Sequence, residues 1–178
     1  MSTLLERSGL VATWRRINPK FEPGLWECCE LDGGGEAVPH PAPSARRQIV
    51  LTDIYCQIAE QIGHVAAMSV AVTTPSFGIR VPDVVWMPPE KWEALDLEAP
   101  VPFVPDLCVE VLLDRKFPQD VGPRVSAYLE GGAREVIVVG PRGELQFWGA
   151  NGPLQTSALG IQLSLDQTFF DDFPPSSH

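Results

Sequence analysis

The chain has 178 residues, of which 44% are hydrophobic, and it carries a formal net charge of −10. This length and composition allow one sizeable core and give no reason to expect two full domains. The acidity excludes a surface that binds nucleic acid passively, because such binding depends on Lys and Arg side chains that neutralise phosphates. A nucleic-acid site would have to be a local basic or metal-filled cleft.

The sequence lacks an apolar run near the roughly 18 residues of a membrane-spanning helix, and its N-terminus does not have the order of a signal peptide. We therefore expect a cytoplasmic protein with no membrane partner. The expected organisation is one domain over residues 26–170, with a helical and loop extension at 1–25 and a polar tail at 171–178.

The first half of the chain predicts a hairpin and a long helix. Residues 2–16 predict a short helix interrupted near Gly9, and residues 25–43 predict a hairpin that turns at Asp32-Gly33-Gly34-Gly35. Ser44 is a suitable N-cap for a helix over residues 45–62, with Gly63 placed to end it. Apolar side chains recur every four residues along this helix, at Val50, Ile54, Ile58 and Ile62.

The second half predicts several strands and one more helix. HVAAMSVAV and IRVPDVVWM predict two strands, and a proline-rich linker separates them from a strand in PDLCVEVLL. Residues 120–131 have the apolar spacing of a helix. REVIVVG and ELQFWG predict a hairpin, and LQTSALGIQLSL predicts a last pair of strands. This order of elements predicts an α+β, or mixed α/β, fold.

Three carboxylates stand where apolar residues should dominate: Glu30 in WECCELDG, Asp83 in IRVPDVVWM and Glu110 in LCVEVLL. A carboxylate is costly to bury unless it is paired, neutralised or bound to a cation, so a solvent-facing or salt-bridged role is the structural alternative. Two carboxylates on neighbouring strands, with a backbone carbonyl such as that of Val111, would offer the oxygen ligands that Mg²⁺ prefers. Arg124, on the next helix, is a candidate cation for stabilising a phosphate in the transition state.

The runs RVPDVVWM and PDLCVEVLL, followed by a basic residue four positions before the tyrosine of RVSAYLEGGAREVIVVGP, resemble the Uma-type restriction endonuclease family of the PD-(D/E)XK nuclease-like superfamily. CELDGGGEAVPHPAPSARRQIV is similar to that family's glutamate-bearing hairpin and the start of its first helix. The resemblance runs from about residue 26 to residue 149. It implies a restriction-endonuclease-like core with a central mixed sheet flanked by helices, Mg²⁺-dependent cleavage of DNA with Mn²⁺ as a possible substitute, and a homodimer.

The resemblance also assigns roles to single residues. Asp83 and Glu110 match the family's metal-binding aspartate and glutamate. Glu30 matches the upstream glutamate, although the extra glycine in Gly33-Gly34-Gly35 keeps Glu27 as a rival.

The lysine expected in such a site is replaced. The literal E-x-K position is Leu112, and the family's position on the following helix is Arg124. Arginine can steady a phosphate, but it cannot readily lose a proton to act as a base. Lys116, in the loop past the strand, is a weaker substitute, and Arg47 stands where relatives commonly carry histidine.

Three interpretations follow. The chain is a metal-dependent DNA endonuclease with Asp83, Glu110, Arg124 and Glu30 at its site, or a nuclease fold that has lost catalysis and serves as a binding or dimerising module. The third is an unrelated structural domain without an active site.

Overall fold

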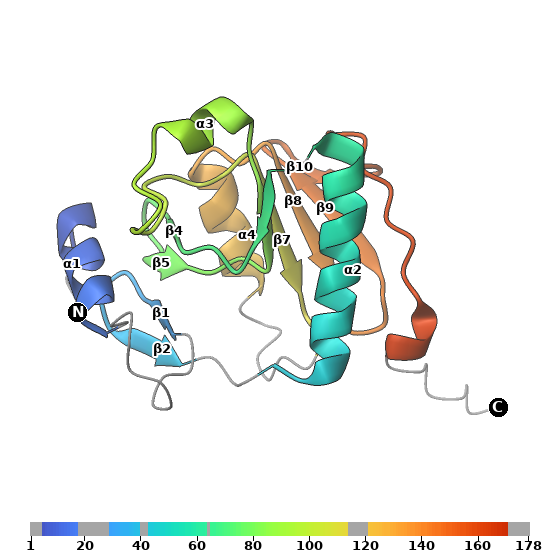
Figure 1. Ribbon diagram of the computed structural model, residues 1–178, viewed down its shortest axis with the longest axis horizontal. Coiled ribbons are helices and arrows are strands. Elements are labelled where there is room, and N and C mark those ends of the chain that lie inside the picture. The colour runs from blue at the N-terminus through green and yellow to red at the C-terminus, as the bar shows by residue number, and fades with distance from the viewer. Residues whose placement is uncertain (1–4, 18–28, 40–42, 64, 114–120, 171–178) are drawn as a thin grey trace.

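The fold is built on two sheets (Figure 1). The computed structural model describes residues 5–17, 29–39, 43–63, 65–113 and 121–170 of the chain. Within these residues the larger sheet has six strands in the order β10-β9-β8-β7-β6-β3. Their bounds are β3 (Ala66–Met68), β6 (Val84–Trp86), β7 (Leu107–Val111), β8 (Glu135–Val139), β9 (Leu145–Gly149) and β10 (Gly152–Leu154). β7 and β8 are parallel and the other neighbours antiparallel, so the predicted central mixed sheet is confirmed.

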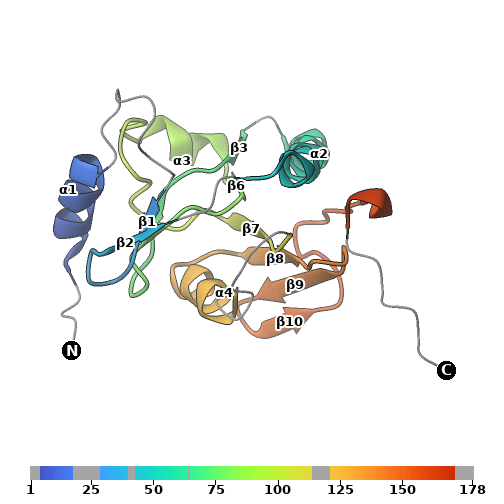
Figure 2. The same ribbon diagram turned by 90° about the horizontal axis from the view of Figure 1, so that it is seen from below.

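Two helices cover the opposite faces of this sheet, as Figure 2 shows: α2 (Ala45–Ile62) and α4 (Val121–Glu130). The apolar stripe of α2 packs with alternate residues of β7, such as Val109 and Val111. Cys108 belongs to the cluster on the α4 face, together with Val125 and Tyr128. Because side chains alternate along a strand, Glu110 points to the same face as Cys108, towards α4.

The start and end of α2 agree with the sequence prediction. Ser44 accepts a hydrogen bond from the Arg47 N–H at 3.1 Å, as an N-cap should. Gly63 follows the last turn with φ of 114°, a left-handed conformation that favours glycine. The predicted helix over residues 120–131 is confirmed as α4 within the described residues.

The smaller sheet has the order β2-β1-β5-β4 among the described residues. Its strands are β1 (Cys29–Leu31), β2 (Ala37–Pro39), β4 (Val72–Thr73) and β5 (Ile79–Arg80). β1 and β2 form the predicted hairpin, whose turn is closed by two N–H groups that donate to Asp32 Oδ1 at 2.9 Å.

Helix α1 (Arg7–Ile17) packs against the smaller sheet, with Leu10 in contact with Leu31 and Ile79. The predicted interruption near Gly9 is wrong, since the helix continues through it. A single glycine lowers helix stability by about 1 kcal/mol, which tertiary packing can offset.

Two predicted strands are each divided between the two sheets. IRVPDVVWM contains β5 of the smaller sheet and β6 of the larger one, and the change occurs at Pro82, which has no N–H for a strand ladder. HVAAMSVAV contains β3 and the first residue of β4, separated near Ser69, whose φ is 54°. The predictions of two continuous strands are therefore wrong. The change from one sheet to the other at Pro82 places Arg80 and Asp83 where the two sheets adjoin.

The proline-rich linker contains a short helix, α3 (Pro89–Glu93), which the sequence did not predict. The expected strand pair in LQTSALGIQLSL is also wrong, because β10 ends at Leu154 and the chain up to the 3₁₀ helix η2 (Gln167–Phe169) has no strand.

Side-chain amides hold this last segment in place of a strand partner. Gln61 of α2 both donates to and accepts from the Gln162 backbone at 2.8 Å, and Gln57 does the same with Ser164. These four bonds resemble a strand ladder, but they come from a helix surface, which a search for strand patterns does not detect.

No helix in the described part of the chain has the length and apolar character needed to span a bilayer.

Candidate functional site

Asp83 lies just before β6 and is fixed by its own backbone and by its neighbours. Its N–H donates to the Val109 carbonyl at 2.9 Å, which places it beside β7. Its carboxylate accepts a hydrogen bond from the Val111 N–H at 2.6 Å (Oδ2) and another from Arg47 Nη2 at 2.6 Å (Oδ1). The sequence prediction placed the Val111 carbonyl beside the carboxylates, whereas the group that contacts Asp83 is the Val111 N–H.

Glu110, the fourth of the five residues of β7, is fully buried. Its Oε1 accepts a hydrogen bond from the Tyr128 hydroxyl at 2.6 Å and lies 3.5 Å from Arg124 Nη1. Burial raises the pKa of Tyr128 well above its ordinary value, and the charge of Glu110 raises it further. Tyr128 therefore stays protonated and acts as a hydrogen-bond donor that orients Glu110.

Glu30 of β1 is the most heavily bonded of the three carboxylates. Arg124 donates to both of its oxygens, at 2.7 and 2.5 Å, in the two-pronged geometry that arginine and carboxylate favour. Arg80 donates to Oε2 at 3.1 Å and the Val81 N–H donates to Oε1 at 2.9 Å. Glu30 is fully buried, so these four bonds stabilise its charge and connect the smaller sheet to α4.

Arg124 stays charged in this environment. Burial alone would lower the pKa of its guanidinium, but the carboxylates of Glu110 and Glu30 raise it above its ordinary value. The side chain is 4% exposed and bonded to Glu30. Arg124 is thus a permanent positive charge between two carboxylates and does not act as a base.

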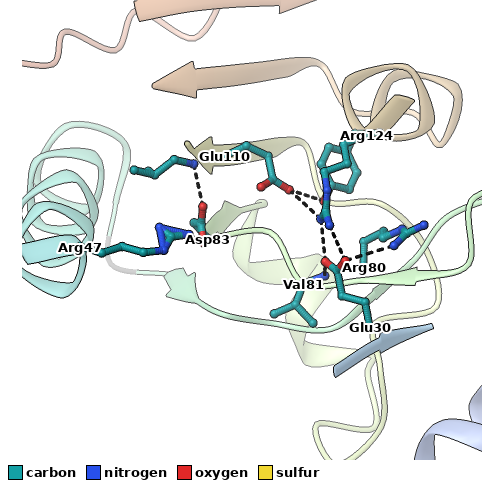
Figure 3. Close-up of polar contacts among 9 residues, drawn as sticks. Glu30, Arg47, Arg80, Val81, Asp83, Glu110 and Arg124 are labelled. Atoms are coloured by element: carbon teal, nitrogen blue, oxygen red, sulfur yellow. Dashed lines mark hydrogen bonds and ion pairs between the residues drawn. The ribbon is translucent and has the colours of Figure 1, made fainter. Parts of the chain in front are cut away.

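Figure 3 shows two neighbouring sets of polar contacts: one joins Glu110, Arg124 and Glu30, and the other joins Asp83 to Arg47. Asp83 lies between Arg47 and Glu110, and Arg124 lies between Glu110 and Glu30. The alternatives Glu27 and Lys116 lie outside the described residues. Lys91 is the lysine within them, and its Nζ contacts Asp106 at 2.6 Å.

Two residues of this set were not singled out in the sequence. Arg80 is a charged residue in a short apolar strand, a signal of the same kind as the one that drew attention to Glu110. Tyr128 was used only to locate Arg124. Its position one helical turn after Arg124 is a sequence signal that both side chains face the same strand.

The donor set of Asp83 and Glu110 fits a hard divalent cation. Mg²⁺ takes oxygen ligands and commonly binds one or two protein carboxylates while keeping several waters. Asp83 lies just before the start of β6, and Glu110 lies near the end of the neighbouring antiparallel strand β7. Glu30 fits less well, because its two oxygens already accept four hydrogen bonds from Arg124, Arg80 and Val81. Among the described residues, no group of three or more His, Cys, Asp or Glu side chains surrounds a common point.

A sequence profile of the Uma2 family, described as "Putative restriction endonuclease", matches residues 27–168. The chain belongs to the Uma2 family. The match covers both sheets and all the carboxylates described above, and it confirms the resemblance seen in the sequence.

The fold of this Uma2 protein also occurs in a solved structure. A crystal structure from Anabaena variabilis ATCC 29413, described as "a putative nuclease belonging to DUF820", matches with a TM-score of 0.59 and 14% identity. The match covers 75% of this chain and 77% of that chain. At this identity it shows the fold, which is restriction-endonuclease-like as predicted. No curated protein matches the chain.

Family and fold together place this Uma2 protein among nuclease-like proteins, a group that generally uses divalent metal ions.

Proposed function

We propose that the chain is a Mg²⁺-dependent endonuclease that hydrolyses DNA phosphodiester bonds, with Asp83 and Glu110 as the metal ligands. The observation that carries this proposal is the placement of two buried carboxylates on neighbouring strands, Asp83 just before β6 and Glu110 near the end of β7, each held by a hydrogen-bond donor. Mn²⁺ is the natural substitute ion for testing it.

The chain's own residues prepare the carboxylates for this task. The Val111 N–H holds Asp83 and the Tyr128 hydroxyl holds Glu110, so neither side chain has to be ordered when a ligand arrives. When bound, a divalent cation would lower the pKa of a water and neutralise charge on the phosphate.

Glu30 and Arg124 have supporting roles in this proposal. Arg124 places a permanent positive charge 3.5 Å from Glu110, and Glu30 fixes the guanidinium from the opposite side. The charge of Arg124 would help to stabilise a phosphate in the transition state through its field. Because arginine does not give up its proton, the proton of the attacking water would have to pass to solvent or to the phosphate.

One observation favours a second function. Three arginines, Arg47, Arg80 and Arg124, already neutralise the three buried carboxylates. A site whose negative charge is balanced internally attracts a cation less strongly. The chain would then be a nuclease fold without catalysis, acting as a binding or dimerising module.

A metal titration separates the two functions. If Asp83 and Glu110 bind metal, saturating Mn²⁺ at 100 times its Kd should stabilise the wild type by about 2.7 kcal/mol, a rise in Tm of roughly 5 to 10 °C. Asp83→Asn and Glu110→Gln should abolish this rise together with the nicking of supercoiled plasmid DNA.

Asp106→Asn is the matched control. Asp106 is also a buried carboxylate beside β7, but it pairs with Lys91. This variant should lose stability and still respond to Mn²⁺. A wild type that shows neither a Mn²⁺ response nor nicking would favour the second function.

A further inference from the structure

Arg47 differs from the other arginines of the site in its exposure. Its side chain is 12% exposed, compared with 4% for both Arg80 and Arg124. Its backbone is fixed in the first turn of α2 by Ser44, so only the side chain beyond it can move. Arg47 is therefore the arginine of this set nearest to solvent.

The guanidinium of Arg47 is only partly bonded. Nη2 donates to Asp83 Oδ1 at 2.6 Å, but Nη1 is buried and has no hydrogen-bond acceptor among the described residues. Leaving a buried donor without an acceptor is unfavourable, and the cost is greater for a charged group. Both terminal nitrogens of Arg124, by contrast, donate to Glu30.

The contact of Arg47 also lies where a metal would bind. Oδ2 of Asp83 is held by the backbone N–H of Val111, whereas Oδ1 accepts from Arg47, a side chain that can move away from a cation. A monovalent guanidinium and a divalent ion on one carboxylate oxygen repel each other. Binding of the metal at Asp83 would therefore weaken or break the contact with Arg47.

We infer that Arg47 is an exchangeable counter-ion of the site, which pairs with Asp83 in the metal-free chain and moves to a backbone phosphate of DNA when a divalent cation takes Asp83. The inference rests on the proposed function of Asp83 as a metal ligand. The released guanidinium has two terminal nitrogens for a phosphate, which arginine binds in a two-pronged geometry. The N-terminus of α2 also favours an anion at this position.

The test measures metal binding and DNA binding separately. Mn²⁺ affinity is measured by calorimetry on the wild type, Arg47→Gln, and Arg134→Gln as a control that removes an exposed arginine between α4 and β8. We expect Arg47→Gln to bind Mn²⁺ about tenfold more tightly, since the competing charge is gone. Arg134→Gln should bind Mn²⁺ like the wild type.

DNA affinity should change in the opposite direction. With a phosphorothioate duplex that resists hydrolysis, Arg47→Gln should bind about tenfold more weakly than the wild type in saturating Mn²⁺, with a salt dependence reduced by about one phosphate contact. Without Mn²⁺ the two proteins should bind the duplex equally. A residue with a merely structural role would not change the two affinities in opposite directions.

Three outcomes would overturn the inference. Equal or weaker Mn²⁺ binding by Arg47→Gln, with a normal response in the wild type, overturns the exchange and leaves the proposed function intact. Absence of Mn²⁺ binding in both proteins overturns both. If Arg47→Gln does not fold, Arg47→Lys serves in its place, because lysine keeps the charge but not the planar guanidinium. The DNA affinity of Arg47→Lys in Mn²⁺ should then fall about threefold relative to the wild type. An unchanged DNA affinity would contradict the inference.

Discussion

Glu30 and Asp83 are both buried carboxylates paired with arginine, yet the two pairs differ in their exposure and in the number of hydrogen bonds. Glu30 is fully buried and accepts four hydrogen bonds, from Arg124, Arg80 and Val81. Asp83 has a side chain that is 9% exposed and accepts bonds from Arg47 and Val111. We call Glu30 with Arg124 the closed pair, and it connects the smaller sheet to α4. We call Asp83 with Arg47 the open pair, and it lies where a ligand could exchange with the arginine.

The largest effect should come from breaking the closed pair. Arg124→Met leaves Glu30 and Glu110 buried without their shared positive charge, and we expect a loss of about 3 to 5 kcal/mol in the free energy of unfolding. Urea denaturation measures it. The double variant Glu30→Gln with Arg124→Met should recover part of the loss, because the uncompensated charge at Glu30 is removed as well. A loss below about 1 kcal/mol for the single variant would show that the pair is not closed.

Removing the Tyr128 hydroxyl, which donates to Glu110 next to the closed pair, should have an intermediate effect on the free energy of unfolding. Tyr128→Phe deletes the hydroxyl that donates to Glu110 at 2.6 Å and should cost about 1.5 to 3 kcal/mol, since the acceptor is charged and buried. The same variant should weaken Mn²⁺ binding without abolishing it, because Glu110 remains but is no longer oriented. Urea denaturation measures the free energy of unfolding, and calorimetry on the same preparation measures the Mn²⁺ affinity. If neither quantity changes in Tyr128→Phe, Tyr128 does not orient Glu110.

The burial of Cys108 and Tyr128 near the closed pair also predicts a loss of stability at alkaline pH. Burial raises the pKa of Cys108 well above its ordinary value, with further contributions from Glu110 and Asp106, and Tyr128 is shifted in the same direction. A group whose pKa is higher in the folded than in the unfolded state contributes fully to stability below its unfolded-state pKa. This contribution is lost as the pH rises from the unfolded-state pKa through the folded-state pKa.

The thiol of Cys108 should therefore account for about 1 kcal/mol of lost stability between pH 9 and 10. Urea titrations at both pH values should show this fall in the wild type and a smaller one in Cys108→Ala. An equal fall in the two proteins would mean that Cys108 does not cause it.

The smallest effect on stability should come from breaking the open pair. Arg47→Met removes one bond to Asp83, but it also removes a buried donor that has no acceptor among the described residues. We expect a loss of about 1 kcal/mol or less without metal. If Arg47→Met were as destabilising as Arg124→Met, the distinction between the open and closed pairs would fail.

Much of the fold follows from local patterns in the sequence. The cap at Ser44, the four-residue spacing along α2 and the largely apolar run of β7, which is buried throughout, each act within one element, so they predicted that element correctly. The divided strand at Pro82 could not be predicted in the same way, because two short strands in different sheets have the composition of one long strand.

The buried charges of the candidate site were predictable from the sequence, and their bonding was not. Asp83 and Glu110 were visible as charges in apolar strands, because burial of a charge is costly wherever it occurs. The arginine partners were harder to assign, since they come from α2, α4 and β5, and their pairing depends on how the two sheets meet. Arg80 shows this well: its role depends on Glu30, which lies 50 positions earlier.

The most direct test is a crystal structure of the wild-type chain grown with Mn²⁺, in which anomalous scattering locates the metal. We predict a manganese ion bonded to both Asp83 and Glu110, and no ion at that position in crystals of Asp83→Asn. Manganese bound elsewhere, or an intact contact between Arg47 and Asp83 with no ion beside it at saturating Mn²⁺, would contradict the assignment of these carboxylates as metal ligands.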